Sequence, residues 1–291
     1  MPELPEVETI ARGLNRRVAG DVIESVWLGS KPEPLKSPAT EIVNALESRR
    51  IAGVRRVGKQ FVFDLENGGR ASAAKKSGVR RRRARARTPA PTSAAAQWIV
   101  HLGMTGRMLV CPPGAETEKH THAVAKLASG RELRFVDPRR FGRLSVSSGF
   151  EAAGSEPLDV ELASFVVLFR GRKTPIKSAL LNQKLLSGVG NIYADESLFR
   201  ARVRPRRRAA SLTRDELGRL YQTVREVLKE AIALGGSSIS DYVDSDGKEG
   251  FFQLQHRVYG REGQPCLVCK TPVKRVVIAG RSAHYCPKCQ K

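Results

Sequence analysis

The chain begins Met1-Pro2-Glu3, three residues that could carry out chemistry at a masked carbonyl carbon. A small second residue favours removal of the initiator methionine, which would leave Pro2 with a free secondary amine. An α-amino group has a pKa of about 7.7–8.0, so a useful fraction is unprotonated near neutral pH. Its attack on carbon gives a Schiff base, which from proline is a permanently charged iminium. Glu3 is the nearest proton donor or acceptor. The plainer interpretation is that Pro2 and Pro5 only stiffen the start of a helix.

Four of the five cysteines have the spacing of a zinc site. Cys266 and Cys269 form one pair, Cys286 and Cys289 form the other, and 16 residues separate the pairs. Four thiolates complete the coordination of Zn²⁺, so we expect one structural zinc ion. Cys111 lies outside this cluster and is expected to be a buried or loop thiol.

The segment between the cysteine pairs predicts a β-hairpin. Two short strand patterns, 273–278 and 282–285, flank a turn at Ala279-Gly280. Arg281 would lie at the tip, where a cation can meet a phosphate. From spacing alone, an ordinary solvated arginine is the more common outcome.

A second candidate for phosphate binding is the tight turn at 187–190, which lies between predicted helices at 175–186 and 191–199. Glycines let the backbone approach a ligand, and a helix N-terminus offers free N–H groups to a phosphate. Asn191 can cap the second helix or donate to a phosphate. Basic residues lie alongside, and we expect Lys177 among them to contact DNA: Arg172, Lys173, Lys177, Lys184, Arg200, Arg202 and Arg204.

The N-terminal half must position these groups on short strands. A helix is predicted to start at Pro5 and to stop at Gly20, with apolar residues at helical spacing between them. A second helix is predicted at 40–48. Short strands with frequent turns favour a sandwich or barrel, and they are predicted at 22–28, 51–57, 61–65, 98–102, 107–110, 123–127, 132–136 and 143–146. Residues 147–159 have the composition of a domain linker.

The pattern becomes helical from Val160. Thr213 and Glu216 form a capping box before a long amphipathic helix that stops at Gly235-Gly236. Short strands return only around the cysteines.

The composition predicts a polyanionic partner. The net charge is +22, and a protein this basic is usually built to meet nucleic acid. Residues 68–97 contain nine Lys and Arg and no acid, but removing them still leaves +13. This segment has low complexity and is predicted to be a disordered basic insert. It either adds non-specific DNA affinity or is a tolerated surface insertion.

The sequence has no apolar run of the roughly 18 residues that a membrane span needs, and no signal-peptide pattern. We therefore expect a cytoplasmic protein in a reducing compartment, associated with the nucleoid. Metal ligands or free thiols are then the better interpretation of the cysteines.

Together these features resemble the formamidopyrimidine-DNA glycosylase family of base-excision repair enzymes. The leucine after Pro2-Glu3 resembles the residue found in the 8-oxoguanine-type branch of the family. The resemblance spans nearly the whole chain apart from about residues 68–97. It rests on PELPEVET, HLGMTGR at 101–107, KHTH at 119–122, DPRRFG at 137–142, KLLSGVGNIYADESLF at 184–199, SDGKEGFF at 245–252, and VYGREGQPC with the terminal cysteines.

The resemblance implies a multidomain α+β fold. Residues 1–150 would form an N-terminal catalytic β-sandwich flanked by helices, 151–255 a helix–two-turns–helix DNA-binding domain, and 256–291 a C-terminal zinc ribbon. It implies a monomeric, bifunctional enzyme that binds damaged double-stranded DNA, removes oxidised purines such as 8-oxoguanine and formamidopyrimidines, and cleaves the strand by β,δ-elimination.

The resemblance also implies catalytic roles. Pro2 would be the nucleophile at C1′ and Glu3 the acid/base partner at the sugar. Lys59 would be the proton donor for β-elimination and Arg281 the proton donor for δ-elimination. In the family, two basic residues usually precede this lysine more closely, whereas here Val57-Gly58 separate it from Arg55-Arg56.

The DNA contacts implied by the resemblance fall into three groups. His120, Arg139 and Arg172 match DNA-contacting positions, and Asn191 matches a phosphate contact. Met104 and Phe141 join Arg139 in a wedge that fills the gap left by the extruded base. The loop 245–252 matches the pocket for the damaged base.

Two other functions remain open at this point. One is a specificity for oxidised pyrimidines, similar to endonuclease VIII. The other is a zinc-ribbon DNA-binding or damage-sensing protein without catalysis, although Pro2, Glu3 and Lys59 are all present.

Overall fold

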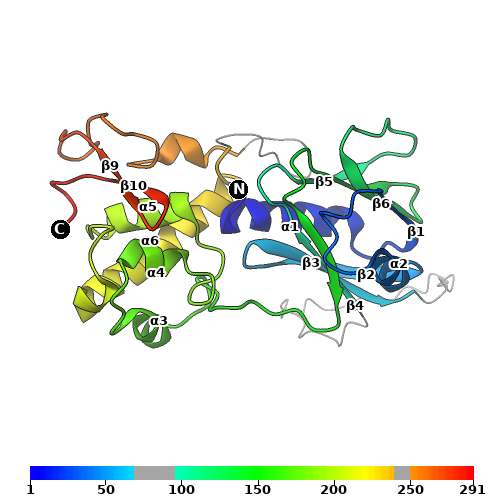
Figure 1. Cartoon of the computed structure of the whole chain (residues 1–291), viewed down its shortest axis with the longest axis horizontal. Coiled ribbons are helices and arrows are strands. Elements are labelled where there is room, and N and C mark those ends of the chain that lie inside the picture. Colours follow the sequence, from blue (N-terminus) through cyan, green and yellow to red (C-terminus); the bar gives the residue numbers. More distant parts are fainter. Residues whose placement is uncertain (69–95, 239–249) are drawn as a thin grey trace, which may run out of the picture.

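The computed structural model of the chain describes residues 1–68, 96–238 and 250–291. A β-rich half and a helical half lie side by side, joined through residues 148–161 (Figure 1). Apart from its ends, the predicted disordered insert 68–97 lies outside the described residues. So does the 245–249 part of the predicted base pocket.

Two four-stranded antiparallel sheets form the β-rich half, which confirms the predicted sandwich. In spatial order, one sheet contains β1 (Ile23–Leu28), β6 (Thr121–Leu127), β7 (Glu132–Val136) and β5 (Arg107–Cys111), and the other β2 (Arg49–Val57), β3 (Gln60–Asn67), β4 (Ala96–His101) and β8 (Arg143–Ser147). Alternate side chains point inward, so large apolar residues such as Phe63, Trp98 and Phe135 fill the core. Helix α2 (Ala39–Leu46) packs against β1, β4 and β8.

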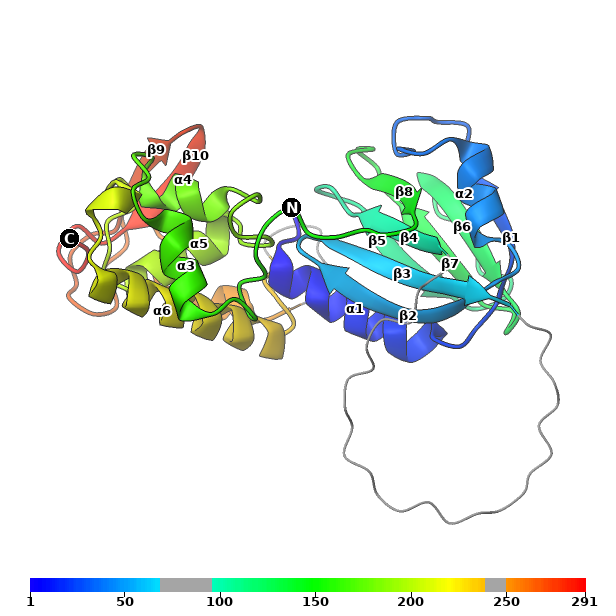
Figure 2. The ribbon, with the colours of Figure 1, turned by 90° about the horizontal axis from the view of Figure 1, so that it is seen from below.

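Helix α1 (Leu4–Val18) connects the two halves. Its apolar face, which includes Val7, Ile10 and Leu14 at helical spacing, packs into the sandwich core. Leu4, at the start of the helix, is instead buried in the core of the helical half. The helix therefore delivers the N-terminus to the junction between the halves, where both Figure 1 and Figure 2 show it.

In the described residues, the helical half is built from four α-helices around one apolar core. These are α3 (Leu162–Phe169), α4 (Ile176–Leu181), α5 (Asn191–Arg200) and α6 (Arg214–Ala233), with a short 3-10 turn, η1, at Ala209–Ser211. The predicted capping box is present at the start of α6, where Thr213 Oγ accepts the Glu216 N–H at 3.2 Å and Glu216 accepts the Thr213 N–H at 2.9 Å. Helix α6 packs along α5, α3 and α1.

Helix α4 is shorter than the predicted 175–186. It ends at Leu181 because Asn182 adopts an extended backbone. The side-chain amide of Gln183 then donates to the carbonyls of Leu181 and Val189, each at 2.9 Å, and accepts the Gly188 N–H at 2.9 Å. One polar side chain thus shapes the turn, and the apolar residues that follow are buried without being helical.

The C-terminal segment starts with a 3-10 turn, η2 (Phe252–Gln255), and ends in the predicted hairpin of β9 (Lys274–Ile278) and β10 (Arg281–Tyr285). Ala279 and Gly280 turn the chain with positive φ angles of 47° and 77°. Strand β10 packs against α5, so the hairpin belongs to the helical half (Figure 2). Among the described residues, every helix is too short or too polar to cross a membrane.

Candidate active site

Glu3 is a buried carboxyl at the junction of the two halves, with 5% of its surface exposed. Burial raises its pKa to about 7, against the opposing charge of Lys59. Its Oε1 accepts the Ile192 N–H at 3.4 Å, whereas Oε2 has no partner among the described residues. Gly190 leaves room for it, because a Cβ there would lie 2.1 Å from Glu3 Cδ. The carboxyl can therefore donate or accept a proton beside Pro2 near neutral pH.

Lys59 lies in the tight turn between β2 and β3, directly after Gly58. Gly58 has a φ of +60°, and a Cβ at this position would lie 2.2 Å from Ser187 Oγ in the helical half. Glycine suits this position because it adopts the positive φ readily and leaves room for the Ser187 side chain, which explains the residue that separates Lys59 from the preceding arginines. Burial lowers the pKa of Lys59, Glu3 raises it, and Arg281 lowers it further. The three charged groups therefore share one electrostatic environment.

Arg281 is the first residue of β10 and is exposed at the hairpin tip. The hairpin that carries it is anchored to α5 by Asp195, which is fully buried. One carboxylate oxygen of Asp195 accepts the backbone N–H of His284 at 2.8 Å and lies 3.2 Å from its ring nitrogen Nδ1. Asn191, at the start of α5, donates to Ser282 Oγ at 3.2 Å. These contacts hold the hairpin against α5, and its Arg281 is near enough to Lys59 to lower the pKa of that lysine.

Lys177 corrects the sequence analysis. Its side chain is 1% exposed, and its ammonium pairs with Asp195 at 2.6 Å and donates to the Ser282 carbonyl. Burial lowers its pKa, and Asp195 raises it. With its charge engaged inside the protein, Lys177 supports the hairpin and is not available to contact DNA.

Three residues predicted to enter DNA lie together at an exposed edge of the sandwich. Met104 is 46% exposed and Phe141 is 52% exposed, which is unusual for apolar side chains of this size. The Arg139 guanidinium lies 4.8 Å from the centre of the Phe141 ring. The two loops touch at Gly103, where a Cβ would lie 2.6 Å from the Phe141 backbone.

A buried carboxylate holds the two loops of this predicted wedge in place. Asp137 accepts the Gly142 N–H at 2.7 Å, the Arg139 N–H at 3.2 Å and the Thr105 hydroxyl at 2.6 Å. Its own N–H donates to the carbonyl of His120, which is exposed at the start of β6 and has a φ of +69°. His120 therefore lies next to the wedge.

Arg172 lies apart from this group, in the loop between α3 and α4. It is exposed, and its guanidinium donates back to the Leu168 carbonyl in α3.

The four C-terminal cysteines meet the geometric requirements of a zinc site. Their Sγ atoms all lie within 4.8 Å of one another, with Cys266–Cys289 at 3.9 Å and Cys269–Cys286 at 3.4 Å. Tetrahedral Zn–S bonds of about 2.3 Å place sulfurs about 3.8 Å apart. The donor set is complete without a substrate or water, as in a structural zinc centre.

Three family models match the chain in succession. The formamidopyrimidine-DNA glycosylase N-terminal domain matches residues 1–144, and the H2TH domain of the same family matches residues 153–243. The zinc finger found in FPG and IleRS matches residues 263–291, which identifies the cysteine cluster as a zinc site. The chain belongs to the formamidopyrimidine-DNA glycosylase family.

Full-length relatives agree with this membership. Formamidopyrimidine-DNA glycosylase of Solibacter usitatus is 41% identical over 300 residues, covering all of both chains. The crystal structure of the MutM (Fpg) protein of Thermus thermophilus is similar with a TM-score of 0.81 at 41% identity, covering 99% of this chain and 98% of the other. A mutant of the Lactococcus lactis Fpg, solved in complex with Fapy-dG-containing DNA, has a TM-score of 0.83 at 30% identity and full coverage of both chains. The Lactococcus lactis Fpg was also solved with abasic-site DNA.

Two residues of this glycosylase family member belong to the site although the sequence analysis missed their role. Burial raises the pKa of Glu6, whose carboxylate accepts the N–H groups of Glu3 and Ser237, each at 2.8 Å, and the Tyr193 hydroxyl. Burial and the nearby cations Arg143 and Lys59 lower the pKa of His101 to about 4, so its ring is neutral at pH 7. Glu6 lies in the motif PELPEVET and His101 in HLGMTGR. Only their burial and their neighbours in the structure reveal their hydrogen bonds and their shifted pKa values.

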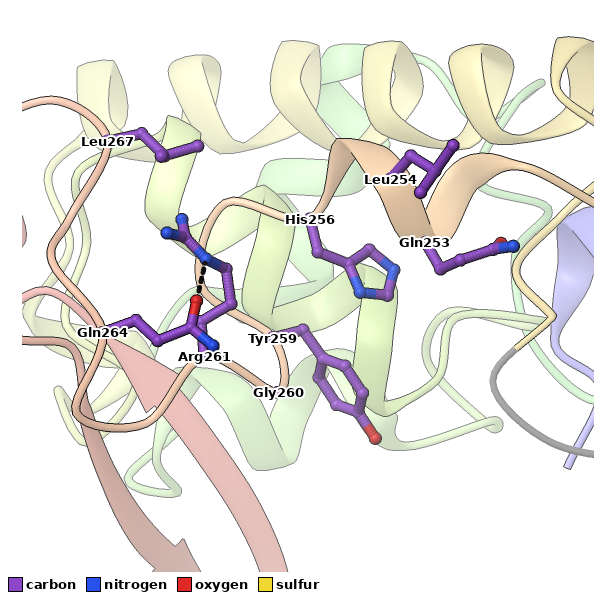
Figure 3. A pocket seen from close by; sticks show the side chains of 8 residues that line it. All are labelled: Gln253, Leu254, His256, Tyr259, Gly260, Arg261, Gln264 and Leu267. Carbon is purple, nitrogen blue, oxygen red and sulfur yellow. Dashed lines mark hydrogen bonds between the residues drawn. The ribbon is translucent and has the colours of Figure 1, made fainter.

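A cavity of about 480 Å³ lies beside η2 in this family member (Figure 3). Its lining comprises Gln253, Leu254, His256, Tyr259, Gly260, Arg261, Gln264 and Leu267. The rings of His256 and Tyr259 meet edge to face, with centroids 5.6 Å apart. This cavity is lined by the segment that leads to the zinc finger and by none of the predicted catalytic residues.

Proposed function

We propose that the protein is a bifunctional DNA glycosylase and abasic-site lyase that removes oxidised purines from duplex DNA. The observation that carries the proposal is the convergence of Pro2, Glu3, Lys59 and Arg281 at the junction of the two halves. Pro2 and Glu3 come from the start of α1, Lys59 from the turn between β2 and β3, and Arg281 from β10. Lys59 lowers the pKa of Glu3, and both Glu3 and Arg281 affect the pKa of Lys59. Family membership supports a glycosylase acting on damaged DNA.

The first step forms a covalent adduct at the sugar. After removal of Met1, the Pro2 nitrogen attacks C1′, and the base leaves with the electron pair of the glycosidic bond and takes a proton from water. The proton released from the Pro2 nitrogen passes to Glu3. Glu3 returns it to O4′ as the C1′–O4′ bond breaks, which leaves an iminium. A carboxyl with a pKa of about 7 suits this two-way transfer.

The iminium then draws electrons from the sugar. Water takes the proton from C2′, the electron pair of that C–H bond forms the C2′–C3′ double bond, and the phosphate leaves C3′ with the bonding pair and takes a proton from Lys59. Water then takes the proton from C4′, a C4′–C5′ double bond forms in the same way, and the second phosphate leaves C5′ and takes a proton from Arg281. Water finally hydrolyses the iminium and regenerates Pro2.

Chemistry at C1′ requires the nucleotide to leave the base stack. The exposed Met104 and Phe141, with Arg139 between their loops, are suited to fill the gap, because apolar and arginine side chains stabilise an interrupted stack. Asn191 and Arg281 lie on the opposite half, where they can hold the phosphates on either side of the lesion.

Borohydride trapping on a duplex that contains 8-oxoguanine tests the proposal. The wild-type enzyme should give a covalent adduct, and Pro2→Gly with a blocked N-terminus should give none, because no amine is available. Mass spectrometry should show that Met1 is absent. Absence of a wild-type adduct would contradict the mechanism and favour a damage-binding protein without catalysis.

A parallel assay on thymine glycol tests the substrate class. Excision of 8-oxoguanine should be faster; faster excision of thymine glycol would instead establish an endonuclease VIII-like specificity.

A further inference from the structure

Arg56, near the end of β2, is a buried cation that the mechanism above does not use. Its side chain is 7% exposed and bonds to three acceptor groups. Nε donates to Glu8 in α1 at 2.8 Å, and the two terminal nitrogens donate to both oxygens of Glu156 at 2.8 and 2.7 Å. One terminal nitrogen also donates to the Gly58 carbonyl at 3.2 Å. A guanidinium so fully engaged has no free face for a phosphate.

The acceptors of Arg56 come from the three segments that meet at the active site. Glu8 lies on the helix that carries Pro2 and Glu3. The Gly58 carbonyl belongs to the turn that carries Lys59. Glu156, 100 residues away in the sequence, lies where the chain enters the helical half.

The Glu156 contact also reaches the phosphate-binding turn. Ser155, the neighbour of Glu156, pairs with this turn through its backbone, because the Ser155 N–H donates to Leu185 at 3.1 Å and the Ser155 carbonyl accepts from Ser187 at 2.9 Å. Ser187 is the residue against which Gly58 packs. Arg56 and Gly58 therefore fasten the Lys59 turn to the helical half from two sides.

Arginine suits this position better than lysine. Its planar fork makes two parallel bonds to one carboxylate, which fixes direction as well as distance. Burial alone would lower the pKa of Arg56, but the pairing with Glu156 and Glu8 raises it, so the group stays charged. A lysine ammonium could reach one carboxylate but could not orient both.

We infer that Arg56 is a positioning residue that holds Lys59 where it can donate a proton to the adduct formed at Pro2. The inference rests on the proposed lyase function. Arg56 acts from behind the turn, through the backbone of Gly58, and does not touch DNA. Its loss should therefore leave the attack of Pro2 intact and slow the later elimination.

A duplex with a preformed abasic site, under single turnover with saturating enzyme, separates these steps. Borohydride-trapped adduct reports attack by Pro2, and cleaved strand reports elimination. Arg56→Gln should form the adduct at close to the wild-type rate. Its cleavage should fall by about 10- to 100-fold, since a shift of about 1 Å in a reacting group can cost about 10²-fold. Arg56→Lys should recover part of the loss.

Arg55→Gln is the matched control, because Arg55 lies on the same strand and pairs with Asp64 at 2.7 Å while 45% exposed. It should leave both rates unchanged. If Arg56→Gln does not fold, Glu156→Gln removes the fork alone and should lower the ratio of cleavage to adduct in the same direction.

Two results would overturn the inference. One is an equal loss of adduct and cleavage in folded Arg56→Gln, and the other is no loss of either. Failure of the proposed function would look different, because the wild-type enzyme itself would then give no adduct.

Discussion

The two halves of the molecule hold the proposed catalytic residues by different means. Pro2 and Glu3 lie at the start of α1, and Lys59 lies between β2 and β3, elements that pack around a sandwich core with large buried residues such as Phe63, Trp98 and Phe135. The segment that carries Arg281 has a much smaller cluster, made of Phe199, Val258, Cys266, Val273 and Cys286. Two of these five are zinc-site cysteines, so little apolar surface holds this segment without the metal.

This difference assigns different physical roles to the two sides. Apolar burial supports the elements that carry Pro2 and Lys59, so the loss of one apolar contact should be absorbed by the rest of the core. Zinc and a few polar contacts fix Arg281, and each of these is costly to lose because little else supports the hairpin. The hairpin is therefore expected to be the part of the site that unfolds most easily.

Zinc removal should have the largest effect and should be confined to one half. Structural zinc sites contribute about 10–16 kcal/mol to folding of small domains, so chelation should unfold the hairpin and remove Arg281 and Ser282 from the site. We expect tight DNA binding and strand cleavage to be lost. Gel-shift and cleavage assays before and after chelation measure this, and added zinc should restore both activities.

The sandwich provides the internal control for that experiment. Trp98 is buried in its core and stacks on Phe63 with ring centroids 4.9 Å apart. The tryptophan fluorescence, to which Trp98 and the exposed Trp27 of β1 both contribute, should stay native after chelation. A shift of the emission maximum towards that of solvent-exposed tryptophan would show that the two halves unfold together. It would contradict the claim that zinc supports only the hairpin.

Substitution of Asp195 by Asn should have the next largest effect. The change leaves the Lys177 ammonium buried without its partner and weakens the contact with the His284 N–H. Breaking a buried pair in this way typically costs about 3–5 kcal/mol. We expect a lower melting temperature and an accumulation of the β-elimination product, because Arg281 is displaced.

Glu230→Gln is the control for Asp195→Asn. Glu230 pairs with Arg200, on the same helix as Asp195, at 2.7 Å but is 49% exposed. An exposed pair contributes about 0–1 kcal/mol. If Asp195→Asn were as mild as Glu230→Gln, the hairpin would have other anchors of equal strength.

The sequence predicts the elements of both halves better than it predicts the contacts between them. Strands with alternating apolar residues, such as β7 at 132–136, lie where their pattern indicates. Lys177 did not follow its pattern, since a lysine among surface arginines gives no sign that a buried aspartate 18 residues later will pair with it. Helix α4 ended at Leu181 although the apolar pattern continued, because Asn182 is extended and Gln183 bonds within the turn that follows.

The same limit applies to the site. Motifs indicate Pro2, Glu3 and the cysteines, because their types and spacing already define a chemistry. Arg56 has no such signal, because Glu8 and Glu156 become its partners only after the two halves have met. The reason for a glycine at position 58 likewise cannot be read from the sequence, because it depends on the contact with Ser187 in the other half.

The smallest of these effects is expected for Glu3→Gln. It tests, through the pH dependence of stability, whether the Glu3 carboxyl has a raised pKa in the folded protein. Burial raises the pKa of Glu3 from 4.5 to about 7 in the folded protein. The folded state thus binds more protons than the unfolded state between these values, and stability falls as pH rises through this range. The loss is complete above about pH 7 and amounts to about 3 kcal/mol.

Glutamine has nearly the same shape and no charge to desolvate, so Glu3→Gln should be more stable than wild type at pH 8 and about equal to it near pH 5. Denaturant unfolding of zinc-saturated protein, followed by Trp98 fluorescence, measures the difference. Glu6 and Lys59 are present in both proteins, so their titration largely cancels. The exposed Glu24 supplies the control, and Glu24→Gln should show no such pH dependence. A gain from Glu3→Gln that is equal at both pH values would mean that the carboxyl is charged or neutral throughout, and Glu3 could not then shuttle a proton beside Pro2.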